Sequence, residues 1–148
     1  MARDGYFLVH AKGGETEHGG SELIAIMERD RSDESVAFYD YLVLATNRTD
    51  TMQRELDAAV RRGFLAVAQT VYETAFGGQE IVVIMERSLD DDRPVCEYEL
   101  LATQRTSTMQ KEMSESAARG FVARGLSVSK TAYGGKEVVV VMERCVAP

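Results

Sequence analysis

The sequence contains one segment written twice. Residues 38–87 align without a gap on residues 95–144 at an offset of 57, and 25 of these 50 positions are identical. A third, partial copy precedes them, because residues 5–29 align on residues 63–87 at an offset of 58. Repetition at a period of this length is typical of chains built from one supersecondary unit used several times. The repeat therefore constrains the architecture more than any other feature of the chain.

Each full copy opens with an expected strand, residues 41–46 in the first copy, and continues into a helix. From Met52 onward, apolar residues recur at i, i+4, i+7 and i+8, which is the stripe of an amphipathic helix. Asp50 and Gln53 have the spacing of a capping box that begins this helix. Gly63 suits the left-handed position at which a helix ends.

The rest of each copy predicts a β-hairpin. Its arms are residues 64–75 and 80–85 in the first full copy, and the two glycines between them, Gly77 and Gly78, permit the positive φ of a primed turn. Met-Glu-Arg ends all three hairpins, and we interpret these charged residues as cross-strand pairs. One unit is thus β-α-β-β, and the chain reads ββ-βαββ-βαββ.

We predict an α+β fold made of tandem β-α-β-β repeats preceded by a β-hairpin. The sheets are mostly antiparallel, the helices number two, and the arrangement is pseudo-two-fold symmetric. Residues 1–37 are the partial repeat and its linker, residues 38–94 the first full repeat and its linker, and residues 95–148 the second full repeat. The three parts form one compact unit.

The last strand of each full copy predicts how the sheets pack. Ile81, Val83 and Met85 face one side of this strand, while Val82 and Ile84 face the other. A strand that is apolar on both faces is buried on both. Eight strands span roughly 38 Å, whereas two helices cover roughly 20 Å. We therefore expect facing sheets with the helices outside, and a bare apolar sheet face that a homo-oligomer or a protein partner covers.

The beginning of the chain matches the end of a helix, because residues 2–5 align on residues 60–63. Two explanations remain open. Either the repeat boundaries are permuted in the natural protein, or a strand, a helix and an export signal precede Met1.

Charge and cysteine usage restrict the partners and the compartment. A net charge of −7 and a pI near 4.9 argue against nucleic acid and anionic membranes as partners. Cys96 and Cys145 align with Tyr39 and Ser88 rather than with other cysteines, so we interpret them as two free thiols of a reduced protein. The expected location is the cytoplasm, unless an export signal precedes the chain.

The most suggestive polar segment lies between the strand and the helix of each full copy. Free amides at a helix N-terminus, hydroxyl groups and an arginine together suit an anion. In the competing interpretation the threonines cap the helix and the arginine pairs with an acid such as Glu55. We expect no cofactor, no metal and no catalytic residue, since the chain lacks a phosphate loop, ligand spacing and a nucleophile motif. The candidate ligand-binding residues are Arg48, Thr49, Gln53, Arg105, Thr106 and Gln110.

At Tyr41, the Gly63-Phe64 pair, the hairpin and Arg87, the unit resembles a small bacterial β-α-β-β domain of unknown function. In that family the helix commonly ends in a Gly-Trp pair and the last strand in a basic residue. Phe64 and Phe121 stand here in place of the tryptophan. The resemblance implies a type of fold and no activity.

Three functions follow from these observations. The leading hypothesis is a non-enzymatic module that acts through self-assembly or partner binding. The second is a small-molecule or anion-binding protein with two equivalent sites at the strand-to-helix junctions. The third is an enzyme of a class that the sequence does not identify.

Overall fold

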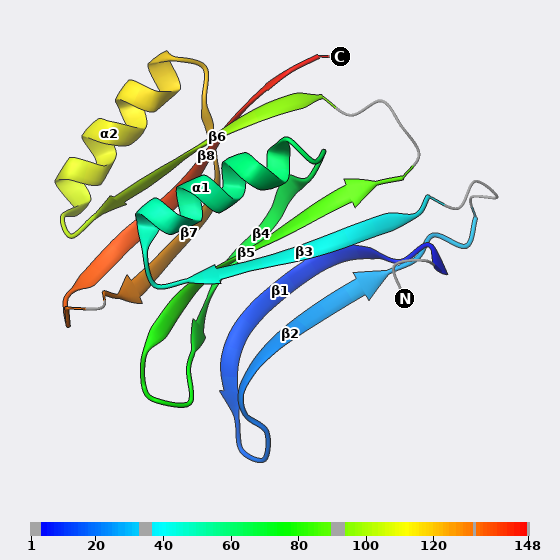
Figure 1. Ribbon diagram of the computed structural model, residues 1–148, viewed down its shortest axis with the longest axis horizontal. Coiled ribbons are helices and arrows are strands. Elements are labelled where there is room, and N and C mark those ends of the chain that lie inside the picture. The colour runs from blue at the N-terminus through cyan, green and yellow to red at the C-terminus, as the bar shows by residue number, and fades with distance from the viewer. Residues whose placement is uncertain (1–3, 33–36, 90–93, 132, 148) are drawn as a thin grey trace.

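The computed structural model describes residues 4–32, 37–89, 94–131 and 133–147, and these residues form eight strands and two helices (Figure 1). The fold is α+β, with a β-hairpin followed by two β-α-β-β units, as the repeat predicts. The elements are β1 (Phe7–Thr16), β2 (Gly20–Glu28), β3 (Tyr39–Thr46), α1 (Thr49–Val60), β4 (Leu65–Glu73), β5 (Gln79–Ser88), β6 (Val95–Thr103), α2 (Thr106–Ala118), β7 (Val122–Lys130) and β8 (Lys136–Val146).

The strands form three separate antiparallel sheets. The first is the hairpin β1-β2, the second has the order β3-β5-β4, and the third has the order β6-β8-β7. In each full repeat the last strand is thus central. Residues 81–85 of β5 are all buried, which confirms the prediction that a strand apolar on both faces is covered on both.

All three hairpins share one irregularity. The pairing of the two strands shifts around Val9 in the hairpin, around Val67 in the second sheet and around Arg124 in the third. A β-bulge adds one residue to one strand and increases the local twist. Because the bulge recurs at aligned positions, the partial copy has the same backbone plan as the two full copies.

The repeats lie in layers, which Figure 1 shows in the order α2, third sheet, α1, second sheet and hairpin. The largest core contains Leu56 of α1, Met85 of β5 and Val141 of β8, so α1 is packed between the second and third sheets. The prediction that both helices lie outside is wrong for α1. Its apolar stripe is wide enough to contact its own sheet on one side and the next sheet on the other.

The opposite face of the second sheet is covered by the hairpin. Ala11 of β1 packs with Val82 and Ile84 of β5, and Val82 is only 2% exposed. The hairpin covers this face over β4 and β5, while Val43 of β3, which pairs with Ile84 and so lies on the same face, remains 51% exposed.

Contacts between neighbouring repeats recur in one direction. The Leu8 amide donates to the Tyr41 hydroxyl at 2.8 Å, and the Ala66 amide donates to the Tyr98 hydroxyl at 2.8 Å. Leu8 and Ala66 are aligned residues of successive copies, as are Tyr41 and Tyr98. Each repeat thus gives this bond to the next one along the chain, which makes the stack head to tail.

The helix ends agree only in part with the sequence prediction. Gly63 has a φ of 83°, so it occupies the expected left-handed position after α1. The helix begins at Thr49 rather than after Asp50, and Arg48 caps it without a side-chain bond. The predicted capping box is absent because Asp50 is the second residue of the helix rather than its N-cap; its carboxylate accepts two bonds from Arg48.

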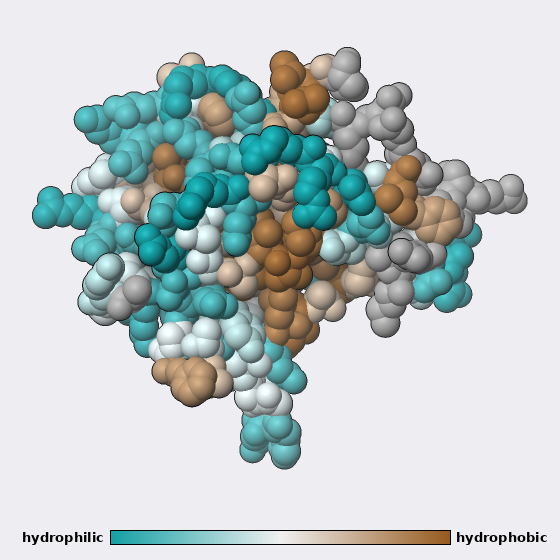
Figure 2. All heavy atoms as spheres, viewed as in Figure 1, coloured by the Kyte–Doolittle hydropathy of each residue, from teal (hydrophilic) through white to brown (hydrophobic). Residues whose placement is uncertain are grey.

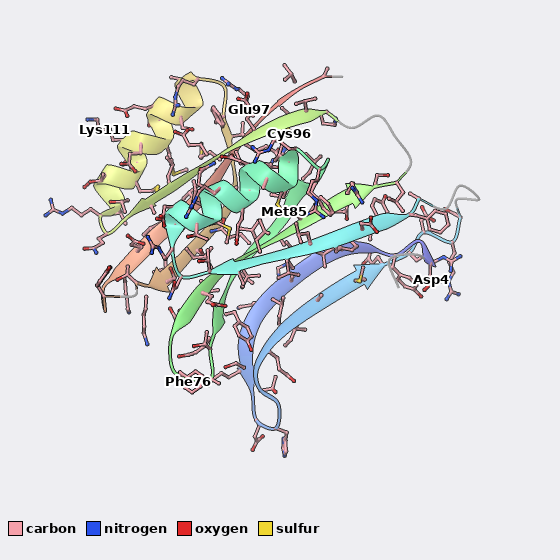
Figure 3. All side chains as sticks on the ribbon, in the orientation of Figure 1. Asp4, Phe76, Met85, Cys96, Glu97 and Lys111 are labelled. Atoms are coloured by element: carbon pink, nitrogen blue, oxygen red, sulfur yellow. A yellow bond between two sulfur atoms is a disulfide. The ribbon has the colours of Figure 1, made fainter. Side chains whose placement is uncertain are left out.

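The hairpin turn is longer than predicted. β4 ends at Glu73 and β5 begins at Gln79, and the Thr74 amide bonds the Gly78 carbonyl at 2.8 Å across the connection. Gly77, with a φ of 78°, needs the left-handed conformation, whereas Gly78 does not. Phe76 projects from this turn into solvent (Figure 3) and is fully exposed.

Candidate functional site

The strand-to-helix junction of the first full repeat places Arg48 beside an acid. Arg48 Nε and Nη2 donate to the two Asp50 carboxylate oxygens at 3.2 Å each, and both side chains are exposed. This pairing raises the pKa of Arg48 and lowers the pKa of Asp50. A hollow of about 440 Å³ adjoins the junction and is lined by Asn47, Arg48, Thr49, Asp50, Thr131, Tyr133 and Glu137. The arginine thus shares the hollow with two carboxylates.

Gln53 serves the packing of the two repeats. Its Nε2 donates to the Tyr98 carbonyl at 2.9 Å, and its Oε1 accepts from the Leu100 amide at 2.8 Å. Both partners are backbone groups of β6, so the Gln53 amide joins α1 to the next sheet.

The second junction has a different environment from the first. Gln110, the counterpart of Gln53, is exposed on α2, the last helix of the stack. Arg105 caps α2 as Arg48 caps α1, and its amide donates to the Thr103 hydroxyl at 3.3 Å. Thr49 and Thr106 are the first residues of the two helices. The structure therefore separates the six predicted residues into one internal junction and one terminal junction.

Buried glutamates form a second polar feature. The Tyr98 hydroxyl donates to Glu143 at 2.5 Å, and Arg124 contacts the other carboxylate oxygen at 2.5 Å. The aligned pair in the first full repeat is Tyr41 and Glu86, at 2.6 Å. Burial is the main cause that raises the pKa of both tyrosines. Both glutamates line one cleft of about 630 Å³.

The Met-Glu-Arg residues pair across strands as predicted. Arg87 contacts Asp40 at 2.7 Å, and Arg144 contacts Glu97 at 2.5 Å, in each case from the last strand to the first strand of the repeat. Each pair thus links the first and last strands of its own sheet.

Cys96 and Cys145 form a disulfide between β6 and β8, so the prediction of two free thiols is wrong (Figure 3). The two residues oppose each other in the ladder, as Tyr39 and Ser88 do in the first full repeat. The repeat alignment carried this signal, because it places both cysteines at positions that face each other in the unit. A Glu143 oxygen lies within 4.8 Å of both sulfurs, but Tyr98 and Arg124 already bond that carboxylate.

The helix-bearing face of the third sheet is open and apolar. The residues beneath α2 are themselves buried, since Phe121 and Met142 are 8% and 2% exposed, and the face is open along β7. In the second sheet the residues aligned with the open part, among them Gln69 and Val71, are partly buried, and Gln69 bonds Ser127 of the third sheet. In the third sheet a groove of about 560 Å³ runs beside α2, and Leu126 of β7 is 66% exposed. Leu126 and Val128 lie on the same face as the groove, because they pair with Val140 and Val138 of β8. We name this surface the α2 face; its apolar residues are Met109, Met113, Phe121, Val122, Leu126, Val128, Val138 and Met142.

The outer side of α2 differs from the α2 face. Lys111 points away from the sheet there (Figure 3), and it forms an exposed pair with Glu115. Figure 2 shows a separate hydrophobic group in the middle of the viewed face, where Figure 1 has β3. Val43 of β3 is 51% exposed. The chain thus offers a second exposed apolar position, away from α2, that can serve as a control.

Comparison with protein-family models, curated proteins and solved structures finds no match. Among the described residues, neither helix is long and apolar enough to span a membrane.

Proposed function

We propose that the chain is a non-enzymatic module that works by binding protein at the α2 face. One observation carries this proposal: β7 is exposed on the α2 face, whereas the aligned residues of β4 (Leu65, Gln69 and Val71) are partly covered by the next sheet. Val122, Leu126 and Val128 of β7 are 53%, 66% and 57% exposed, and they adjoin the groove beside α2. Large exposed apolar patches of this kind mark sites of protein interaction.

The polar groups of the cleft support a structural role over a catalytic one. Tyr98, Glu143 and Arg124 bond one another, so each group already has a partner. The two histidines of the chain, His10 and His18, are exposed on the hairpin. A catalytic site instead needs a nucleophile or base aimed at a place for substrate.

The disulfide bears on the compartment. Disulfides persist in oxidising environments, whereas the cytoplasm keeps thiols reduced. The bond between Cys96 and Cys145 therefore supports an oxidising location over a cytoplasmic one. The net charge of −7 continues to disfavour nucleic acid and anionic membranes as partners.

Selection of peptides from a displayed random library tests the proposal. The protein is immobilised at low density, so that copies do not contact one another. We expect apolar peptides that bind the parent and the variant Val43→Glu, but not the variant Leu126→Glu. Leu126 is exposed, so a charge there costs little folding stability, and the melting temperature checks this. Equal binding to Leu126→Glu, or no enriched peptide, would overturn the proposal.

A second candidate function is anion or small-molecule binding at the strand-to-helix junctions. The hollow beside Arg48 favours it, although Asp50 and Glu137 bring negative charge to the same place. In this case phosphate or a small carboxylate raises the melting temperature of the parent, and Arg48→Ala with Arg105→Ala removes the effect. Absence of any stabilisation in the parent would count against it.

A further inference from the structure

We infer that the partner at the α2 face is a second copy of this chain, which docks the outer face of its hairpin there. This inference rests on the proposed function and adds the identity of the partner. The copies then join head to tail, because the two surfaces that meet are different parts of the chain.

The outer face of the hairpin has the sequence of a buried surface. It carries Ile24 and Ile26 of β2, which are 52% and 54% exposed. Both side chains point away from the second sheet, since their neighbours Leu23 and Ala11 pack toward it. In the two other sheets the aligned residues are 0–5% exposed: Val82, Ile84, Val139 and Val141.

The junction between the second and third sheets shows how such a surface is covered. Val139 and Val141 of β8 lie in one core with Ile81 and Met85 of β5. Val139 and Val141, which align with Ile24 and Ile26, thus pack against the helix-bearing face of the second sheet. When a second copy docks in the way that the third sheet packs on the second, its Ile24 and Ile26 contact the α2 face of the first copy.

Both halves of this junction are present in a single chain, and each has an exposed part: Ile24 and Ile26 on the hairpin, and Leu126 and Val128 on the α2 face. Val138 and Met142, the counterparts of Ile81 and Met85, line the groove beside α2. Within the described residues, the hairpin and α2 are the first and last layers of the stack. One end therefore supplies the projecting isoleucines, and the other end supplies the groove.

The new junction differs from the internal one in polarity and in width. Inside the molecule Gln69 bonds the Ser127 hydroxyl at 2.8 Å and packs closely on Gly125. In a second copy Leu126 takes the place of Gln69, His10 that of Gly125 and the charged Lys12 that of Ser127. The apolar leucine strengthens burial, while the histidine side chain holds the two strands further apart.

A junction between unlike surfaces has a distinct consequence for assembly. Each copy keeps one free end after it binds, so association continues into a filament or closes into a ring. A two-fold dimer, in which both copies use the same surface, stops at two.

Sedimentation velocity over a range of concentrations tests this inference with two variants. Ile26→Glu damages only the hairpin end, and Leu126→Glu damages only the α2 end. We expect the parent and Val43→Glu to grow beyond the dimer with concentration, and each end variant alone to stay monomeric. A mixture of the two variants forms dimers and nothing larger, because each retains one intact and complementary end.

Three results would overturn the inference: a monomeric parent, an effect of only one end variant, or no dimer in the mixture. The inference and the proposed function are separable. If the parent is monomeric while library peptides still distinguish it from Leu126→Glu, the α2 face binds protein but not a second copy. If neither measurement shows binding, both proposals fail.

Discussion

Tyr98 connects three parts of the molecule through one hydroxyl group. It donates to Glu143 of its own sheet at 2.5 Å and accepts from the Ala66 amide of the preceding repeat at 2.8 Å. Tyr41 does the same with Glu86 and Leu8, but it is less buried. Buried polar groups that lose a partner are costly, so this residue contributes to the junction more than its aromatic ring alone.

Replacing this hydroxyl should therefore weaken the molecule at the junction. Tyr98→Phe is expected to lower the free energy of unfolding by about 1–3 kcal/mol, since Glu143 and the Ala66 amide lose a partner in a buried place. Tyr41→Phe is the matched variant and should cost less, because water reaches its surroundings. Urea denaturation of both variants checks this. An equal effect of the two would show that burial does not set the cost.

The sequence predicted the roles of some single residues and missed others. The left-handed glycines Gly63 and Gly120 were predictable, because a helix that ends in glycine has a local cause. The pairing of Arg87 with Asp40 also follows from strand register. The capping box was wrong because the helix begins at Thr49, which places Asp50 inside it, where its carboxylate bonds Arg48. Local spacing does not show which of two available partners a side chain takes.

Among the elements, α1 lies between two sheets and has to pack against both. Its apolar residues reach both sheets, and Gln53 uses both groups of its side-chain amide on the β6 backbone. α2 has nearly the same sequence pattern, but no sheet of the described residues lies beyond it. The same helix thus has a structural role in one repeat and an exposed flank in the other.

This difference predicts unequal effects of two aligned substitutions. Gln53→Ala is expected to lower the free energy of unfolding by about 1–3 kcal/mol, because the Leu100 amide and the Tyr98 carbonyl lose their partners. Gln110→Ala, on the exposed surface of α2, should change it by less than about 0.5 kcal/mol. Chemical denaturation measures both. If Gln53→Ala were as mild as Gln110→Ala, these bonds would not hold α1 to β6.

The elements themselves were largely predictable, whereas their layering was not. Period-3.6 and strand-like patterns located both helices and the hairpins, because these patterns have local causes. The position of α1 between sheets, and the covering of Val82 by the hairpin, depend on which face of one repeat meets the next. That choice involves residues far apart in sequence, and aligned copies look alike whether their faces are covered or open.

For the molecule as a whole, the disulfide closes the third sheet near the end of the chain. It joins residues that are 49 positions apart, and it links the first and last strands of the second full repeat. In the first full repeat, Tyr39 and Ser88 occupy the aligned positions. Of the two full repeats, the second, whose helix-bearing face no described sheet covers, is the one that carries the covalent link.

Removing this link should destabilise the fold while leaving it intact. Cys96→Ser with Cys145→Ser is expected to lower the free energy of unfolding by about 2–4 kcal/mol, chiefly because the unfolded chain gains freedom. Thermal and urea unfolding measure the loss. The parent treated with a dithiol reductant should show the same stability as the double variant. A double variant as stable as the oxidised parent would contradict the prediction.

The sequence predicted that an exposed apolar surface exists, but not where it lies. Apolar strands on both faces indicated that some sheet face needs a cover, and such a face exists beside α2. Its location depends on the direction of stacking, which no single repeat encodes. The six junction residues remain a prediction for ligand binding, and Gln53 has a structural partner that the sequence did not indicate.

The one-directional stacking of the repeats has a consequence for how the length of such a chain can change. Interaction energies in a stacked array are confined to neighbours. A further copy of residues 38–94, placed after residue 94, would meet a layer of its own kind on each side and would leave both outer surfaces unaltered. Duplication or loss of a whole unit thus changes the length of the stack by one layer at a time. It changes the distance between the two ends of the molecule and preserves what each end recognises.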